Sequence, residues 1–153
     1  MSKGLLCLVF LALVVLAAGK TITFKDCATA PPGKGVIKKI DVNPCPAEPC
    51  SLHKGTNVTV DVTFVAGENA TTATSVVHGI IADVPVPFPL PHPDACKFGG
   101  LKCPVQSGTQ YDYHAILFVD PIYPQLKLVV KWEVQDQSQK DLFCFEAPLQ
   151  IVP

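Results

Sequence analysis

The sequence predicts an all-β protein built as an antiparallel β-sandwich, and three observations support this fold class. Apolar and polar residues alternate with a period of two in several segments, which is typical of strands with one buried face. Residues with turn chemistry separate these segments, and the 153-residue chain contains 15 prolines, which interrupt helices. No run of ten residues has a clear helical period. We therefore expect about seven short strands in an immunoglobulin-like pair of sheets.

Two segments carry the strongest strand pattern. In Val58–Phe64, Val and Phe alternate with Thr and Asp, which predicts a strand with one buried face and one solvent-exposed face. Leu126–Gln135 continues the same alternation over a longer stretch, with Val129 as the single apolar residue in its polar register. Weaker patterns predict further strands at Thr21–Phe24, Val36–Val42, Ser75–Ile81, Tyr111–Val119 and Leu142–Ile151.

The segment Val84–Pro93 has a proline at every second position and does not fit an ordinary strand. Because proline has no backbone N–H, this segment cannot lie inside a sheet and should form a stiff, extended edge. Val86, Phe88 and Leu90 present apolar side chains along it. Two interpretations stay open at this point: a rigid crossover between the sheets, or a preset apolar wall of a ligand site.

The first 19 residues have the pattern of a secretory signal peptide. The basic residue Lys3 precedes the apolar run Leu5–Ala18, and Ala17-Ala18-Gly19 supplies the small residues that precede a cleavage site. The run is shorter than the roughly 20 residues that a membrane-spanning helix needs. We expect cleavage before Lys20, which leaves residues 20–153 as a single secreted domain.

The predicted mature chain has six cysteines, an even number that suits disulfides in an oxidising compartment. Six cysteines allow 15 pairings. Two pairs are close in sequence, so local closure is plausible for each, and the remaining two cysteines would join the ends of the mature chain. These pairs are Cys45 with Cys50, Cys96 with Cys103, and Cys27 with Cys144.

Asn57 and Asn69 each begin a sequon for N-glycosylation. Such a short motif is common by chance, but a signal peptide gives it meaning because the chain then passes through the secretory pathway. Asn57 lies on the solvent-exposed face of its predicted strand. We expect a glycan on at least one of the two residues.

Composition and motifs exclude several functional classes. The formal net charge is −1 and all twelve basic residues are lysines, which argues against a nucleic-acid binder or a phosphotransfer enzyme. The four histidines have no metal-ligand spacing, and the chain has no nucleophile motif of a hydrolase. We expect no catalytic residue, no metal and no cofactor. The many aromatic residues then either fill a core or line a cavity.

Several motifs resemble, in chain order, the Niemann-Pick type C2 family of ML-type lipid-recognition proteins. The run of alternating prolines together with the six cysteines is the most specific part, and the resemblance covers nearly the whole mature chain. The motifs are Phe24-Lys25-Asp26-Cys27, Asn43-Pro44-Cys45-Pro46, Val77-His78-Gly79-Ile80, Val84-Pro85-Val86-Pro87-Phe88-Pro89 and Leu142-Phe143-Cys144.

The resemblance implies two sheets that part to admit a sterol such as cholesterol, and it implies the three disulfide pairings above. It implies non-enzymatic sterol binding and transfer in the lumen of late endosomes and lysosomes. The partner that it implies is the lumenal domain of a Niemann-Pick type C1 membrane protein. We expect a monomer that makes transient contact with membranes.

Matching the family's pocket motifs places Phe88, Val119 and Tyr123 at the lining and mouth of the pocket, with Trp132 on a strand that faces the same interior. Further candidates complete the predicted ligand site. They are Phe64, Val86 and Leu117.

The loop at Ala82-Asp83 departs from the family, which has an apolar knob there near the pocket mouth. A carboxylate at this position weakens the case for the same docking surface. Some members of the family carry fatty acids or other hydrophobic signals. The alternatives are therefore a secreted carrier of such molecules, or a β-sandwich interaction module without a ligand.

Overall fold

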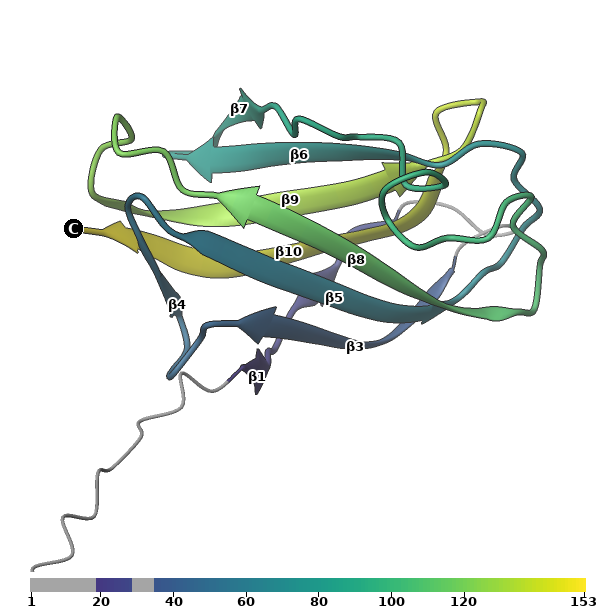
Figure 1. The fold of residues 1–153 in the computed structure, drawn as a ribbon, viewed down its shortest axis with the longest axis horizontal. Helices are drawn as coiled ribbons and strands as arrows, with labels where there is room; N and C mark the ends of the chain where they lie inside the picture. The colour runs from purple at the N-terminus through teal and green to yellow at the C-terminus, as the bar shows by residue number, and fades with distance from the viewer. Residues whose placement is uncertain (1–18, 29–34) are drawn as a thin grey trace, which may run out of the picture.

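Two β-sheets face each other in the computed structural model, which describes residues 19–28 and 35–153 (Figure 1). The predicted signal peptide lies outside the described residues except for Gly19. The structure contains ten strands and, in its described part, no helix. The strands are β1 (Lys20–Thr21), β2 (Lys25–Asp26), β3 (Val36–Asn43), β4 (Cys50–His53), β5 (Asn57–Val65), β6 (Thr74–Ile81), β7 (Val84–Phe88), β8 (Gln110–Phe118), β9 (Leu126–Gln135) and β10 (Asp141–Val152).

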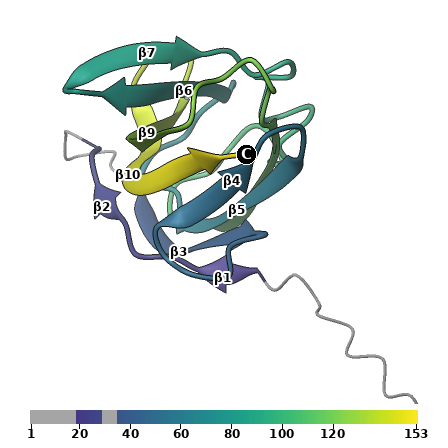
Figure 2. The same cartoon turned by 90° about the vertical axis from the view of Figure 1, so that its left-hand side faces the viewer.

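The first sheet has the order β1-β3-β5-β8, and the second has the order β2-β10-β9-β6-β7 with β4 beside β10. Figure 2 shows the two layers from one end. In β5, Val58, Val60, Val62 and Phe64 are buried and alternate with partly exposed residues, as the sequence predicts. The predicted all-β sandwich is therefore confirmed, and its core lies where the inward registers of both sheets meet.

The N-terminal strand prediction is wrong in detail. Thr21–Phe24 is not one strand, because the chain crosses there from one sheet to the other. β1 pairs with β3 in the first sheet and β2 pairs with β10 in the second. Ile22 is buried between them, and its N–H donates to the carbonyl of Ile40 at 2.9 Å.

The sequence patterns missed β4, which pairs in parallel with the C-terminal half of β10. It is only four residues long and follows a disulfide-closed loop, so it is too short for an alternation to stand out. β2 covers the same edge of β10 near Phe145, so two short strands share one long neighbour. Together these additions raise the strand count above the predicted seven.

The proline-rich segment forms β7 at the edge of the second sheet, where it pairs with β6. Pro85 and Pro87 alternate with Val84, Val86 and Phe88. The backbone N–H groups that face β6 therefore come from the non-proline residues, and the backbone nitrogens of the prolines face away from β6. This confirms the expected edge. The chain beyond Phe88 then crosses to β8 in the other sheet, so the segment also begins the crossover.

The three predicted disulfides are present. Cys27–Cys144 spans 117 positions of sequence and attaches the N-terminal segment to β10, whereas the other two close loops of 5 and 7 positions. The described part of the chain contains no helix with the length and apolar character needed to cross a bilayer.

Most of the large aromatic side chains fill the core. Phe64 packs against Phe143 with 4.8 Å between ring centroids, and both are fully buried. The hydroxyl of Tyr113 accepts a hydrogen bond from Trp132 Nε1 at 3.1 Å and contacts the hydroxyl of Ser75 at 2.7 Å. These two contacts satisfy the buried polar groups of the aromatic core.

Candidate functional site

Two adjacent apolar cavities lie between the sheets, and they share four lining residues, which are Leu52, Leu117, Val130 and Leu149. We call them the outer and inner cavities. The outer cavity has a volume of about 50 Å³ and the inner cavity about 30 Å³. Side chains particular to the outer cavity include Val77, Phe88, Val119, Tyr123, Leu128 and Ile151. Those particular to the inner cavity include Ile22, Val58, Val60, Trp132 and Phe145.

An aromatic pair stands at the rim of the outer cavity. The rings of Phe88 and Tyr123 are 5.4 Å apart and tilted by 55°, and both side chains are partly buried. Phe88 ends the edge strand β7, and Tyr123 lies in the loop between β8 and β9 (Figure 1). The Tyr123 N–H donates to the Asp120 carbonyl at 3.1 Å, which holds this loop in a turn. The rim is therefore formed by an edge strand of the second sheet and by the loop that connects the two sheets.

Tyr123 carries a hydroxyl group whose ionisation is disfavoured in the folded protein. Burial, and then the negative charge of Asp120, raise the pKa of the Tyr123 hydroxyl above its usual value. The hydroxyl therefore remains neutral at every physiological pH and both donates and accepts hydrogen bonds. The surface of the outer cavity is apolar, and Tyr123 is a lining residue that also carries a neutral hydroxyl.

Gly79 lies in the wall of the outer cavity, close to the side chain of Leu128. A Cβ atom at this position would lie 2.9 Å from Leu128 Cδ1, closer than real side chains approach. A larger residue at this position would require the flexible end of the Leu128 side chain to shift. This gives a physical role to the glycine in the Val77-His78-Gly79-Ile80 motif.

The structure brings together most of the predicted site residues but not all of them. Leu117, Phe88, Val119 and Tyr123 line the outer cavity, and Trp132 lines the inner one together with Leu117. Their contact with a ligand remains a prediction.

Two candidates lie elsewhere. Phe64 is not among the residues that line either cavity, because it packs between Phe143 and Tyr111 in the core. Val86 is 44% exposed on β7 and is likewise absent from both linings. Alternation alone gives no means of separating these positions from the cavity residues.

Several lining residues were missed by the sequence reasoning. Leu128 and Val130 share the register of Trp132 on β9, so their inward direction was readable from the alternation. Leu52 and Leu149 come from the pairing of β4 with β10, for which the sequence carried no signal.

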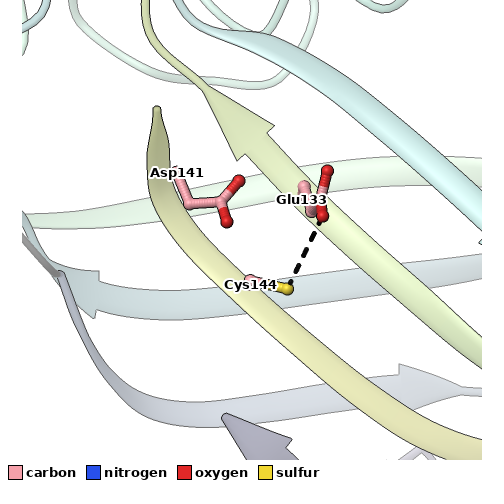
Figure 3. A group of neighbouring side chains, drawn as sticks. All are labelled: Glu133, Asp141 and Cys144. Atoms are coloured by element: carbon pink, nitrogen blue, oxygen red, sulfur yellow. Dashed lines mark hydrogen bonds between the residues drawn. The ribbon is translucent and has the colours of Figure 1, made fainter. Parts of the chain in front are cut away.

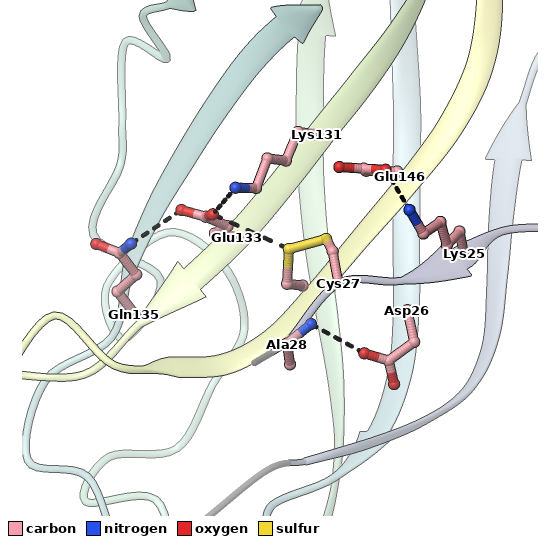
Figure 4. Close-up of polar contacts among 9 residues, drawn as sticks. Lys25, Asp26, Cys27, Ala28, Lys131, Glu133, Gln135 and Glu146 are labelled. Carbon is pink, nitrogen blue, oxygen red and sulfur yellow. Dashed lines mark hydrogen bonds and ion pairs between the residues drawn. A yellow bond between two sulfur atoms is a disulfide. The ribbon is translucent and has the colours of Figure 1, made fainter. Parts of the chain in front are cut away.

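A largely buried polar cluster on β9 and β10 contains Glu133, Asp141 and Cys144, of which Asp141 is partly exposed (Figure 3). One potential ligand atom from each residue lies within 4.8 Å of the others. However, the Cys144 sulfur is bonded to Cys27, so it cannot serve as a thiolate ligand. Glu133 is instead paired with Lys131, whose Nζ lies 2.9 Å from its Oε1 (Figure 4).

The surroundings of Asp141 in this cluster disfavour its ionised form. Burial, followed by the nearby charge of Glu133, raises the pKa of its carboxyl to about 6. One of its oxygens is buried without a hydrogen-bond partner among the described residues. Because the folded protein binds this proton more tightly than the unfolded chain does, ionisation of Asp141 opposes folding.

We predict that Asp141 makes the protein more stable in acid. Its contribution should be most favourable near pH 4 and should be lost as the pH rises through about 6. Asp141→Asn should therefore raise the unfolding temperature at pH 7 by roughly 3 °C, about 1 kcal/mol after solvent screening. Thermal unfolding of both proteins at pH 4 and pH 7 measures this. An equal shift at both pH values would contradict the prediction.

Comparison with known proteins identifies relatives over nearly the whole chain. The ML domain family matches residues 21–151. "NPC intracellular cholesterol transporter 2" of Canis lupus familiaris is 47% identical over 141 residues, which is 92% of each chain. The protein of the same name from Mus musculus is 44% identical over 144 residues, 94% of each chain. The crystal structure of a Niemann-Pick type C2 protein from Japanese carpenter ant superimposes with a TM-score of 0.78 at 28% identity, covering 86% of this chain and 100% of that one.

Proposed function

The chain belongs to the ML domain family, and on that basis we propose that it is a non-enzymatic carrier that binds a sterol between its two sheets and hands it to a membrane acceptor. The observation that carries the proposal is the pair of adjacent apolar cavities between the sheets, the outer of which is lined by Phe88, Val119 and Tyr123. Its relatives at 44–47% identity are named as intracellular cholesterol transporters.

Sterol binding requires the sandwich to open. The cavities have volumes of about 50 and 30 Å³, whereas sites for ligands of this size occupy about 300–1,000 Å³. Their shared wall consists of the aliphatic side chains of Leu52, Leu117, Val130 and Leu149. Rotamer changes in these side chains and a small separation of the sheets would join the cavities into one tunnel. Binding therefore selects or induces an expanded state of the core.

We infer that the sterol enters tail first, past Phe88 and Tyr123, toward Trp132. The inner cavity offers only apolar contacts, which suits an alkyl tail. The sterol hydroxyl would remain near the rim, where the Tyr123 side chain and solvent supply hydrogen bonds. In the reverse orientation, the hydroxyl would be buried among aliphatic groups at a cost of about 2–7 kcal/mol.

The expected affinity suits a carrier. Burial of about 400–500 Å² of sterol surface contributes about 10–12 kcal/mol at about 25 cal/mol per Å². Association and the ordering of side chains cost several kcal/mol, which leaves micromolar to submicromolar binding. Such a complex is tight enough to keep a sterol out of water and loose enough to release it without covalent chemistry.

We further propose that the protein acts as a secreted monomer in the lumen of late endosomes and lysosomes. There it would pass its sterol to the lumenal domain of a Niemann-Pick type C1 membrane protein. Asp83 is exposed in the turn between β6 and β7, with Val84 beside it 59% exposed. The carboxylate makes this tip less apolar than the family's knob, so a partner surface that accepts it needs a basic or polar contact there.

Extraction of the natively secreted protein, followed by lipid mass spectrometry, tests the ligand class. We expect sterol as the main bound lipid, together with saturable sterol binding by the delipidated protein. A fatty acid as the main lipid would make the protein a carrier of another class. The absence of any bound lipid, with no sterol binding in solution, would identify a β-sandwich with a closed core.

A further inference from the structure

An apolar surface lies at the end of β8, on the outer face of the first sheet and away from both cavities. Ile116 is 56% exposed and Phe118 is 51% exposed, and both point outward because they share a register. Ile122 in the following loop is 82% exposed. We call Ile116 and Phe118 the β8 patch. Exposed apolar side chains in adjacent outward positions are typical of a contact surface.

Asn57, the first residue of β5, lies directly opposite Phe118 in the antiparallel pair. The two side chains therefore project from the same face of the sheet, and both are exposed. Asn57 also begins the sequon Asn57-Val58-Thr59. The register thus places a glycosylation acceptor beside the exposed aromatic ring.

The backbone hydrogen bonds indicate that Asn57 and Phe118 form a non-hydrogen-bonded pair of the antiparallel ladder. The Val119 N–H donates to the Thr56 carbonyl at 3.0 Å, and the Gly55 N–H donates to the Val119 carbonyl. The His114 N–H donates to Gly99 at 3.0 Å, on the side away from β5. His114, Ile116 and Phe118 therefore direct their backbone groups outward. Asn57 and Phe118 form a pair without mutual hydrogen bonds, in which side chains approach most closely, with Cα atoms about 4.5 Å apart.

The same geometry leaves part of a sheet edge open. β8 is the last strand of the first sheet, and the loop at Gly99 covers it at His114. No described backbone hydrogen bond from outside the sheet reaches Ile116 or Phe118. An edge with apolar side chains and open backbone groups pairs readily with a second copy of the chain. The edge of the other sheet, β7, is instead protected by Pro85 and Pro87.

We propose that Asn57 carries an N-glycan whose first sugars pack on Phe118 and cover the open end of β8. The glycan is attached through Nδ2 and begins within side-chain reach of the ring. The C–H face of its first sugar provides an apolar surface for the ring, and the outer sugars remain in water. The glycan would then protect the edge of β8 from pairing with a second chain, as the prolines protect the edge of β7. This role does not depend on the ligand of the cavities.

Four chains secreted by cultured animal cells test the proposal: the unmodified protein, Asn57→Gln, Phe118→Thr and the double variant. We expect mass spectrometry to find Asn57 occupied. Asn57→Gln should lower the unfolding temperature by about 3 °C and increase the dimeric and aggregated fraction at least threefold in analytical ultracentrifugation. In the Phe118→Thr background, Asn57→Gln should change the unfolding temperature by less than 1 °C and cause no association.

Asn69 provides the matched control, because it lies in a loop where its side-chain oxygen accepts a hydrogen bond from the Ser107 N–H at 2.9 Å. Asn69→Gln should leave the monomeric fraction unchanged. The unmodified protein should keep its higher unfolding temperature relative to Asn57→Gln after its glycans are trimmed to a single sugar, since the first sugar makes the contact.

Three results would overturn the proposal. The first is an unoccupied Asn57 in the secreted protein. The second is an Asn57→Gln protein that stays monomeric with an unchanged unfolding temperature. The third is binding of the glycosylated protein to phosphatidylcholine vesicles that is lost in Phe118→Thr, because this would make the β8 patch a membrane contact.

Discussion

Replacement of both Cys27 and Cys144 with alanine should destabilise the protein by about 5 kcal/mol. The disulfide closes a loop of 117 positions, and in the chain-entropy description a loop of this size restricts the unfolded chain more than any short loop does. It also attaches the N-terminal segment to β10, with which β2 pairs through only two residues. Urea unfolding of both proteins, monitored by tryptophan fluorescence, measures the difference.

The other two disulfides are matched controls. Their loops span 5 and 7 positions, so removal of either pair should cost only about 2 kcal/mol. Equal costs for all three pairs would show that loop length does not govern their contribution. In that case local packing around each sulfur would be the cause.

Replacement of Phe88 with alanine should lower sterol affinity at least tenfold, which corresponds to about 1.4 kcal/mol. Phe88 is partly buried, ends an edge strand and contacts the Tyr123 ring across the rim of the outer cavity. A fully buried phenylalanine costs about 3–5 kcal/mol of stability when truncated. At a cavity rim that packs against a ligand, much of this loss should appear in binding. The unfolding temperature without sterol should change little. Tyr123→Ser should have the same effect.

Val86→Ala provides the control, because Val86 lies two residues away on the same strand but is 44% exposed and outside both cavity linings. Its sterol affinity should equal that of the unmodified protein. Binding of a fluorescent sterol together with thermal unfolding separates the two quantities. A Phe88→Ala protein with intact binding and a large loss of stability would identify Phe88 as ordinary core.

Local patterns in the sequence were sufficient to predict the long strands. The alternation in Val58–Phe64 and Leu126–Gln135 records which side chains leave water, and β5 and β9 follow it. The alternating prolines of β7 have the same local character, since proline lacks the donor that an inner strand needs. These features depend only on neighbours in the chain.

The short strands could not be predicted in this way. β1, β2 and β4 contain two to four residues each and exist because β3 and β10 offer them an edge. Their stability comes from partners far away in sequence. A period of two needs more residues than these strands have before it becomes visible.

The sequence by itself determined the sandwich class, the disulfide framework and the resemblance that points to a sterol site. Only the tertiary structure decided which inward residues line a cavity and which fill the core. Phe64 and Phe88 are both apolar strand residues, yet one packs against Phe143 and the other faces Tyr123. Alternation specifies the face of a strand from which a side chain projects. What that side chain meets depends on the residues of the opposite sheet, which long-range pairing and the crossing of the two sheets bring into position.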